Sequence, residues 1–326
     1  MKLLISIPVY ELDNTFEIIH NVLKYTKDSY IVIHNNLNSN FSNDILRNIS
    51  DRVIINEERL QMDSPHSNSP NSLWDIIKSN IRASLHLEWS YIILLTSNTR
   101  FVVNGLEDYL SRTKYDAGYS IIPHRNFKYD IDIIQEHKIL SECKKQLPQC
   151  SNLFYDAGYS DKSYNNILVQ PSNFYNNTLP ICENLLPQCS KFFYNTKNNS
   201  EITEHRFPHN NTLSICKKLL PQCSKFYYGN VDGSFINRDI AISFLSYNCI
   251  YDSVIIAPQE IIIPSIIKEK TNKIGEVITY TDWNNNMIIT QEIIDQVRNG
   301  TFLGLFCVKR INMNDPLRTY INQLKN

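Results

Sequence analysis

Glycine is scarce in this chain: only 8 of its 326 residues are glycines. Neither a Gly-x-Gly-x-x-Gly motif nor a Walker-type phosphate loop occurs, which argues against a dinucleotide-dependent oxidoreductase and a P-loop enzyme. An excess of charge is also lacking, because 32 Lys and Arg residues balance 33 Asp and Glu residues, and this excludes a strongly basic nucleic-acid-binding protein. No stretch approaches the ~20 apolar residues of a membrane-spanning helix.

What remains is the composition of a globular protein, with 42% hydrophobic and 20% charged residues. The length suits one large domain or two modest ones. The apolar N-terminus is too short for most signal peptides, and Glu11 and Asp13 stand where a cleavage site would need small residues. We therefore expect a buried first strand and a cytoplasmic protein, in which the eight cysteines are reduced.

The first third of the chain alternates strand-like and helix-like segments. Apolar runs at residues 2–7, 30–34, 52–55 and 91–96 predict strands, and an apolar stripe over residues 73–87 predicts one of the helices between them. Near-continuous apolar strands separated by amphipathic helices are typical of an α/β fold with a mostly parallel sheet covered on both faces. Such sheets bind ligands beyond the carboxyl ends of their strands, which directs attention to Pro8, Val9, Asn35 and Asn98.

The last third continues this alternation. We expect a turn at residues 231–235, a helix over 238–245, a strand at 253–257, a helix-like run at 261–267 interrupted by Pro264, a strand at 302–306, and helices at 291–298 and after Pro316.

A tandem repeat separates the two parts. The sequence Tyr-Asp-Ala-Gly-Tyr-Ser occurs at residues 115–120 and again at 155–160, and a Cys-x6-Cys unit occurs at 143–150, 182–189 and 216–223. The array therefore spans about three copies within residues 115–228. Three copies would just satisfy the minimum for a solenoid. We favour a local duplication inside a single domain of residues 1–326, because both flanks resemble one enzyme-like fold.

The cysteines of these units allow two interpretations. They could bind a metal or form disulfides, but six intervening residues exceed the spacing of a zinc knuckle, and no His residue recurs with them. We therefore expect small packed residues that were copied along with the repeat.

Without phosphate-binding glycines, a diphosphate needs a metal ion or cationic side chains. The only Asp-x-Asp, Asp130-Ile131-Asp132, lies inside the first repeat copy, and we interpret it as a solvated acidic pair. Lys309 and Arg310 end a predicted strand, and Arg318 follows one helical turn into the next element. Guanidinium groups suit phosphate oxygens, although surface cations are the simpler interpretation.

Glu260 precedes a strongly apolar segment. A carboxylate at the mouth of a buried helix is partly desolvated, which favours a general base. The alternative is a carboxylate that only complements the helix dipole.

Several motifs, taken in order, resemble those of the core-2/I-branching β-1,6-N-acetylglucosaminyltransferase-like family, especially its bacterial and viral members. The first strand, Ile5-Ser6-Ile7-Pro8-Val9-Tyr10, is similar to that of GT-A-fold glycosyltransferases. The other matching motifs are Leu94-Leu95-Thr96-Ser97-Asn98, Asp232-Gly233-Ser234-Phe235, Gln259-Glu260 with Pro264, Val308-Lys309-Arg310 and Asn314-Asp315-Pro316-Leu317-Arg318.

This resemblance implies a GT-A-like, Rossmann-like fold and an inverting, metal-independent glycosyltransferase with no cofactor beyond its co-substrate, a nucleotide-sugar. It assigns the base to Glu260. It assigns the neutralisation of the leaving diphosphate to Lys309, Arg310 and Arg318. From their place at strand ends we further expect donor binding by Pro8, Val9, Asn35 and Asn98. For the acceptor we expect binding by Asp232, Gly233 and Trp283. The expected partners are a donor with UDP as the favoured nucleotide and a glycan acceptor, with no nucleic acid.

The chain departs from the family pattern at Asp232, where Glu is usual, and at Thr99, where an acidic residue is common. Two other functions therefore stay open. One is a catalytically inactive relative that binds glycans or proteins through its repeats, and the other is a repeat scaffold whose flanks are merely caps and do not share a sheet.

Overall fold

The computed structural model describes residues 1–61, 73–120, 201–202, 212–227, 229–249, 258–281 and 288–325. These residues belong to one compact unit, which comprises Met1–Ile121, Glu201–Thr281 and Ile288–Asn326. Most of the repeat array, Trp283, the Asp130–Asp132 pair and the strand predicted at 253–257 lie outside the described residues. In the part of the chain that is described, every helix is too short or too polar to cross a bilayer.

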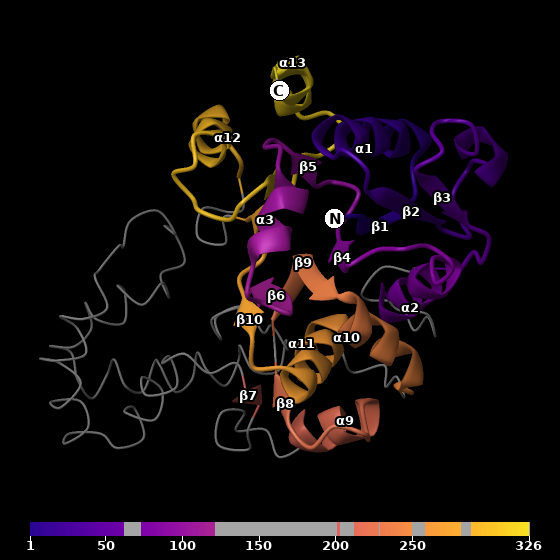
Figure 1. Cartoon of the computed structure of the whole chain (residues 1–326). Helices are drawn as coiled ribbons and strands as arrows, with labels where there is room; N and C mark the ends of the chain where they lie inside the picture. Colours follow the sequence, from indigo (N-terminus) through magenta and orange to yellow (C-terminus); the bar gives the residue numbers. More distant parts are fainter. Residues whose placement is uncertain are drawn as a thin grey trace, which may run out of the picture. The chain divides into compact units, whose positions relative to one another are not determined.

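A mostly parallel sheet forms the centre of this unit (Figure 1). Among the described residues it has seven strands, in the spatial order β10-β6-β9-β4-β1-β2-β3. Their bounds are β1 (Leu3–Val9), β2 (Tyr30–Asn35), β3 (Val53–Asn56), β4 (Tyr91–Leu94), β6 (Ala117–Ser120), β9 (Asn230–Asn237) and β10 (Ile274–Gly275). Only β9 is antiparallel to its neighbours, β4 and β6. The predicted α/β fold with a mostly parallel sheet is confirmed for the described residues.

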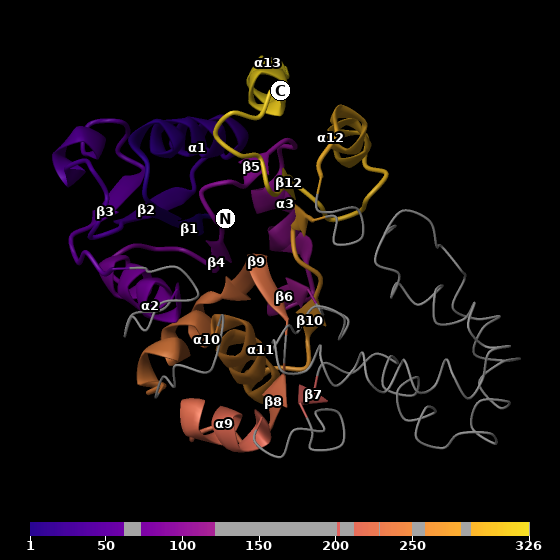
Figure 2. The ribbon, with the colours of Figure 1, turned by 180° about the vertical axis from the view of Figure 1, so that it is seen from behind.

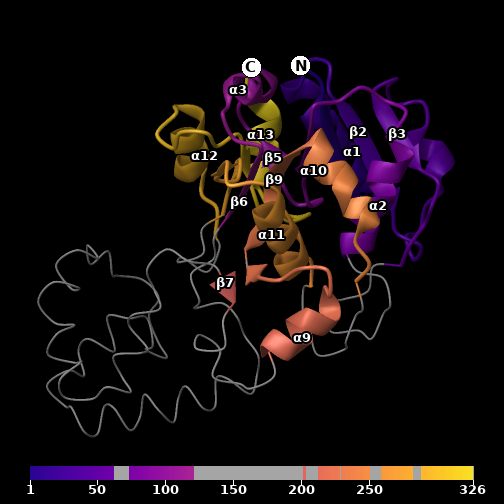
Figure 3. The same ribbon diagram turned by 60° about the horizontal axis from the view of Figure 1, so that its bottom comes forward.

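Helices cover both faces of the sheet. On one face lie α1 (Leu12–Tyr25) and α3 (Leu106–Arg112), whose apolar side chains join the core cluster of β1 and β2. On the other lie α2 (Leu73–Ala83), α10 (Arg238–Ser243) and α11 (Gln259–Lys270), with α2 and α11 in contact (Figure 3). Because strand side chains alternate, the β1 residues Ile5 and Ile7 face α1, while Ser6 and Pro8 face α2.

The C-terminal segment builds a second, smaller sheet. It consists of β5 (Arg100–Phe101), β11 (Thr279–Tyr280) and β12 (Cys307–Val308), with β12 next to β5 (Figure 2). Beside it, α12 (Gln291–Arg298) and α13 (Leu317–Gln323) enclose a separate apolar cluster around Val102, Val308 and Ile311. This arrangement places Lys309, the residue after β12, next to the main sheet.

The two flanks of the repeat array share one sheet, because β9 pairs with β4 along Tyr91–Leu94. This contradicts the interpretation in which the flanks only cap a scaffold of repeats. It also corrects the turn predicted at residues 231–235. That segment is the interior of β9, and its residues Val231, Asp232 and Phe235 are buried between neighbouring strands.

Two further predictions were wrong in detail. The strand expected at 302–306 lies at Cys307–Val308, after a turn. Pro264 does not interrupt its helix, since α11 continues to Lys270. A proline in a helix deprives the carbonyl four residues earlier of its partner, and here that carbonyl, Glu260 O, accepts from Gly229 N at 2.9 Å instead.

The third Cys-x6-Cys unit, residues 216–223, lies within the described residues. It begins inside α9 (Thr212–Leu219) and leads into β8 (Phe226–Tyr227), which pairs with β7 (Glu201–Ile202). Cys216 and Cys223 are buried free thiols, and burial raises the pKa of Cys216 to about 12. The prediction of packed residues in place of disulfides is confirmed for this copy.

Candidate functional site

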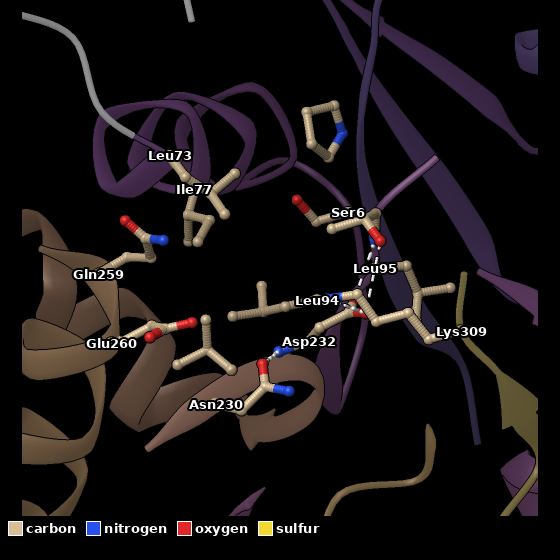
Figure 4. Close-up of a pocket in the computed structure, with 13 residues that line it drawn as sticks. Ser6, Leu73, Ile77, Leu94, Leu95, Asn230, Asp232, Gln259, Glu260 and Lys309 are labelled. Carbon is tan, nitrogen blue, oxygen red and sulfur yellow. Dashed lines mark hydrogen bonds and ion pairs between the residues drawn. The ribbon is translucent and has the colours of Figure 1, made fainter. Parts of the chain in front are cut away.

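A pocket lies at the carboxyl ends of β1 and β4. Here the sheet order reverses, because the chain passes from β1 to β2 and β3 on one side and to β4 on the other. Ligands of open α/β sheets bind in the crevice at such a switch point. The pocket encloses about 510 Å³, including the part open to solvent. Its described lining residues are Ser6, Pro8, Leu73, Ile77, Leu94, Leu95, Thr96, Asn230, Val231, Asp232, Gln259, Glu260 and Lys309 (Figure 4).

Asp232 and Lys309 form an ion pair on one wall. Lys309 Nζ lies 2.9 Å from Asp232 Oδ2, and the side chains are only 15% and 4% exposed. Because β9 runs antiparallel to β4, its first residues lie beside the carboxyl end of β4, where Thr96 N donates to Asp232 Oδ1 at 3.0 Å. The Thr99 hydroxyl donates to Asp232 Oδ2 at 3.3 Å. The Asp232 carboxylate is thus held by the main chain just after β4, and it fixes the ammonium group of Lys309, which follows β12.

This pairing changes the charge of the site. The Lys309 ammonium carries more hydrogens than the contact with Asp232 uses, so it can still donate to a ligand oxygen. Its positive charge, however, is balanced by a nearly buried carboxylate. The wall therefore presents an oriented donor with no net charge.

Glu260 lies on the opposite side of the pocket. It belongs to the first turn of α11, and Figure 4 shows Glu260 and Gln259 entering the pocket across from Asp232 and Lys309. Its main-chain carbonyl, which Pro264 leaves without a helical partner, accepts from Gly229 N just before β9. Pro264 therefore allows the start of α11 to bind the segment that leads to Asp232.

The structure brings together four of the residues selected from the sequence: Pro8, Asp232, Glu260 and Lys309. It also adds Ser6, Asn230 and Gln259, which sequence reasoning did not assign to a ligand. Ser6 could have been identified from the sequence, because it places a hydroxyl group inside an otherwise apolar strand. Asn230 and Gln259 are adjacent to assigned motifs, but only the tertiary structure shows that they line the pocket.

Other selected residues use their polar groups within the protein. Asn35 Nδ2 donates to Phe41 O at 3.1 Å and to Asn43 Oδ1 at 3.0 Å, which closes the loop after β2. Asn98 Oδ1 accepts from the Thr96 hydroxyl at 2.6 Å. Val9 is buried in the core. None of these three lines the pocket among the described residues.

The two C-terminal arginines differ from each other. Arg310 adopts a left-handed conformation, with φ of 75°, and its Nε is buried without a hydrogen-bond partner among the described residues. Non-glycine residues in such conformations cluster at functional sites. Arg318 instead makes its hydrogen bonds inside the protein. Each of its guanidinium nitrogens donates within the protein, to Asn312 O at 2.6 Å, to Asn14 Oδ1 at 2.8 Å and to Glu17.

No candidate metal centre occurs in the described part of the chain, which contains no group of three or more His, Cys, Asp or Glu side chains placed to bind an ion. Cys307, close to Asp232, is not a candidate nucleophile. Burial raises the pKa of its thiol well above the ordinary value, and the negative charge of Asp232 raises it further. The thiol therefore stays protonated at neutral pH.

Gly233 packs against the second sheet next to Asp232. Its φ is +76°, and a Cβ at this position would lie 2.1 Å from Thr279 Oγ1. We expect Gly233→Ala to lower the free energy of unfolding by about 1–3 kcal/mol more than Gly300→Ala, because overpacking adds to the same backbone strain. Gly300 is the matched control, with φ of +73° and no atom within 4 Å of the added methyl. Urea unfolding of both variants measures the difference, and equal losses would contradict the steric argument.

Comparisons with known proteins do not establish a family. No family model matches the chain, and no curated protein matches it. Among solved structures, it is similar to S. aureus TarS (residues 1–349) in complex with UDP-GlcNAc, with 14% sequence identity and a TM-score of 0.26. The match covers 40% of this chain and 36% of the TarS chain, so the chain spans little more than a third of that structure.

Proposed function

We propose that this protein is a glycosyltransferase that moves a sugar from a nucleotide-sugar to a hydroxyl group of a glycan. The observation that carries the proposal is the pocket at the switch point of the sheet, with the Glu260 carboxylate on one wall and the Lys309 ammonium on the other. The motifs that resemble the core-2/I-branching family support it, because Glu260 and Lys309 come from two of them and are 49 residues apart in sequence (309 − 260).

The proposed reaction is a single displacement with inversion. The acceptor hydroxyl gives its proton to Glu260 while its oxygen forms a bond to the anomeric carbon of the donor sugar. The bond between that carbon and the β-phosphate oxygen breaks, and the nucleoside diphosphate leaves with the electron pair. Lys309 stabilises the negative charge that develops on the leaving group, with Arg310 as a second cation next to it in the chain.

Five residues receive a new assignment in the light of the geometry. Asp232 is proposed to hold Lys309 in place, since its oxygens already accept from Lys309, Thr96 and Thr99. Arg318 is proposed to be structural. Asn35 and Asn98 are proposed to shape the loops that flank the site. The acceptor role of Gly233 is replaced by a packing role, whereas that of Trp283 stays a prediction.

The finer parts of the proposal are a UDP-linked donor, membership of the core-2/I-branching family and transfer without a metal ion. A donor screen tests them together. A saturating nucleotide-sugar at 100 times its Kd is expected to stabilise the fold by about 2.7 kcal/mol, which raises Tm by several degrees. We expect the same shift with and without EDTA. A strict requirement for Mn²⁺ would contradict the metal-free mechanism and make Asp130 and Asp132 candidates again.

The same screen separates the active enzyme from an inactive relative. An enzyme releases nucleoside diphosphate from the donor that stabilises it, whereas an inactive relative shows no release. Stabilisation by glycans alone would favour the binding module.

A further inference from the structure

A chain of hydrogen bonds, buried except at its outer end, connects the pocket to the surface beside the last turn of α2. It begins at Glu58, just after β3, whose carboxylate accepts from the Ser79 hydroxyl at 2.5 Å and from Arg82 at 3.1 Å. These donors lower the pKa of Glu58, the Ser79 contact most of all. Glu58 is therefore ionised at neutral pH and can only accept, so the hydrogen of Ser79 must point toward it.

The ionised Glu58 also determines which group donates and which accepts in the next hydrogen bonds of the chain. Since Ser79 has used its hydrogen, it accepts from Asn56 Nδ2 at 2.7 Å, and Asn56 Oδ1 accepts from Glu58 N at 3.0 Å. The orientation of the Asn56 amide is thereby fixed. Its Nδ2 also donates to Asn80 Oδ1 at 2.9 Å, which in turn fixes the Asn80 amide.

The chain ends at Ser6, on the pocket wall. Asn80 Nδ2 donates to Ser6 Oγ at 2.9 Å, so the hydroxyl of Ser6 accepts and its own hydrogen points elsewhere. Among the described residues that hydrogen has no acceptor, although Ser6 is only 2% exposed. The neighbouring wall is formed by apolar side chains, among them Ile77 and Leu94 (Figure 4). Burying a polar hydrogen without an acceptor is costly, which points to a ligand that accepts it.

We infer that Ser6 is a ligand-binding residue that donates a hydrogen bond to a neutral oxygen of the bound ligand, and that Asn80 and Asn56 orient it. A neutral carbonyl or hydroxyl oxygen is favoured over a phosphate oxygen, because Ser6 is held by the neutral Asn80 amide among apolar side chains, whereas the proposed function assigns the charged leaving group to Lys309. Such an oxygen belongs either to the nucleoside or to the sugar of the donor. The inference rests on the proposed function for the choice of ligand.

A double-mutant cycle in the full chain tests the inference, with UDP and UDP-GlcNAc as probes in isothermal titration. Ser6→Ala is expected to weaken binding about 3- to 10-fold, as for the loss of one neutral hydrogen bond. Asn80→Ala is expected to weaken binding in the wild type but to have no effect in the Ser6→Ala background. Ser84→Ala is the control, because Ser84 is a buried serine that donates to Asn80 O and Ile81 O, away from the pocket.

The two probes identify the source of the oxygen. A Ser6 effect on UDP itself assigns it to the nucleoside, and an effect on UDP-GlcNAc alone assigns it to the sugar. Unchanged affinity in Ser6→Ala, or an Asn80→Ala effect that persists without the Ser6 hydroxyl, would overturn the inference. Thermal melts of each variant confirm that it is folded.

A second measurement is independent of the ligand. Neutron diffraction from crystals of the wild-type protein locates the Ser6 hydroxyl deuterium, which we expect to point into the pocket. A deuterium directed at Asn80 would overturn the inference. If neither probe binds the wild type, the UDP-linked donor of the proposed function fails, and this measurement alone decides whether the Ser6 donor exists.

Discussion

Glu260→Gln is expected to reduce the release of nucleoside diphosphate from a bound nucleotide-sugar by about 10²- to 10⁴-fold, the usual contribution of a general base. Glutamine has the same shape but cannot take the proton of the attacking hydroxyl. The contact from Gly229 N uses the main-chain carbonyl of residue 260, so the substitution leaves it intact. The affinity for the donor is expected to stay the same, and the change falls on kcat.

The matched control is Glu269→Gln on the same helix. Glu269 is exposed, and its carboxylate accepts from Cys223 Sγ at 3.1 Å and from Tyr247 Oη at 3.2 Å, outside the pocket. This variant is expected to keep the wild-type rate. Both rates are measured with the donor found by thermal shift, with water as the acceptor where no glycan is known. An unchanged rate in Glu260→Gln would remove Glu260 from the chemistry and favour an inactive relative.

The sheet could be predicted because the residues of its central strands form a recognisable pattern by themselves. The central parallel strands are buried on both faces and therefore read as short apolar runs, as in β1 and β4. The antiparallel strand β9 was missed, because its Asp232-Gly233 pair is typical of a turn. There the aspartate is satisfied by Thr96 and Lys309, which lie 136 and 77 residues away in sequence (232 − 96 and 309 − 232). Partners so distant in sequence leave no pattern in the residues around Asp232.

The candidate site could be predicted in outline for the same reason. The rule that ligands bind at the carboxyl ends of parallel strands led to Pro8. A carboxylate before an apolar helix and a cation at a strand end led to Glu260 and Lys309, and the order of motifs supported both. Which cations face the pocket depends on the path of the chain after β12. Lys309 turns toward Asp232, whereas Arg318, nine residues later (318 − 309), turns toward α1.

Arg318→Ala is expected to destabilise the protein and to leave the affinity for the nucleotide-sugar nearly unchanged. Arg318 is 6% exposed and bonds Glu17, while its Nη2 shares Asn14 Oδ1 with the buried Arg100. Burial and, to a lesser extent, the adjacent charge of Arg318 lower the pKa of Arg100 to about 10. We expect the free energy of unfolding to fall by about 3 kcal/mol, which is the lower end for breaking a buried ion pair. The loss is at the lower end because the side chain of Glu17 is 37% exposed and because the substitution removes a like charge from beside Arg100.

Urea unfolding and donor titration of the same sample separate the structural role from the phosphate-binding role that the sequence suggested. Arg47→Ala is the control, because the side chain of Arg47 is 49% exposed and its ion pairs with Asp44 and Glu57 are on the surface. For Arg47→Ala we expect the free energy of unfolding to fall by less than about 1 kcal/mol. A stable Arg318→Ala variant with weakened donor binding would restore Arg318 to the diphosphate. It would also mean that α13 and the segment before it rearrange when the donor binds, because no guanidinium nitrogen of Arg318 is available for a ligand while its bonds to Asn14, Glu17 and Asn312 persist.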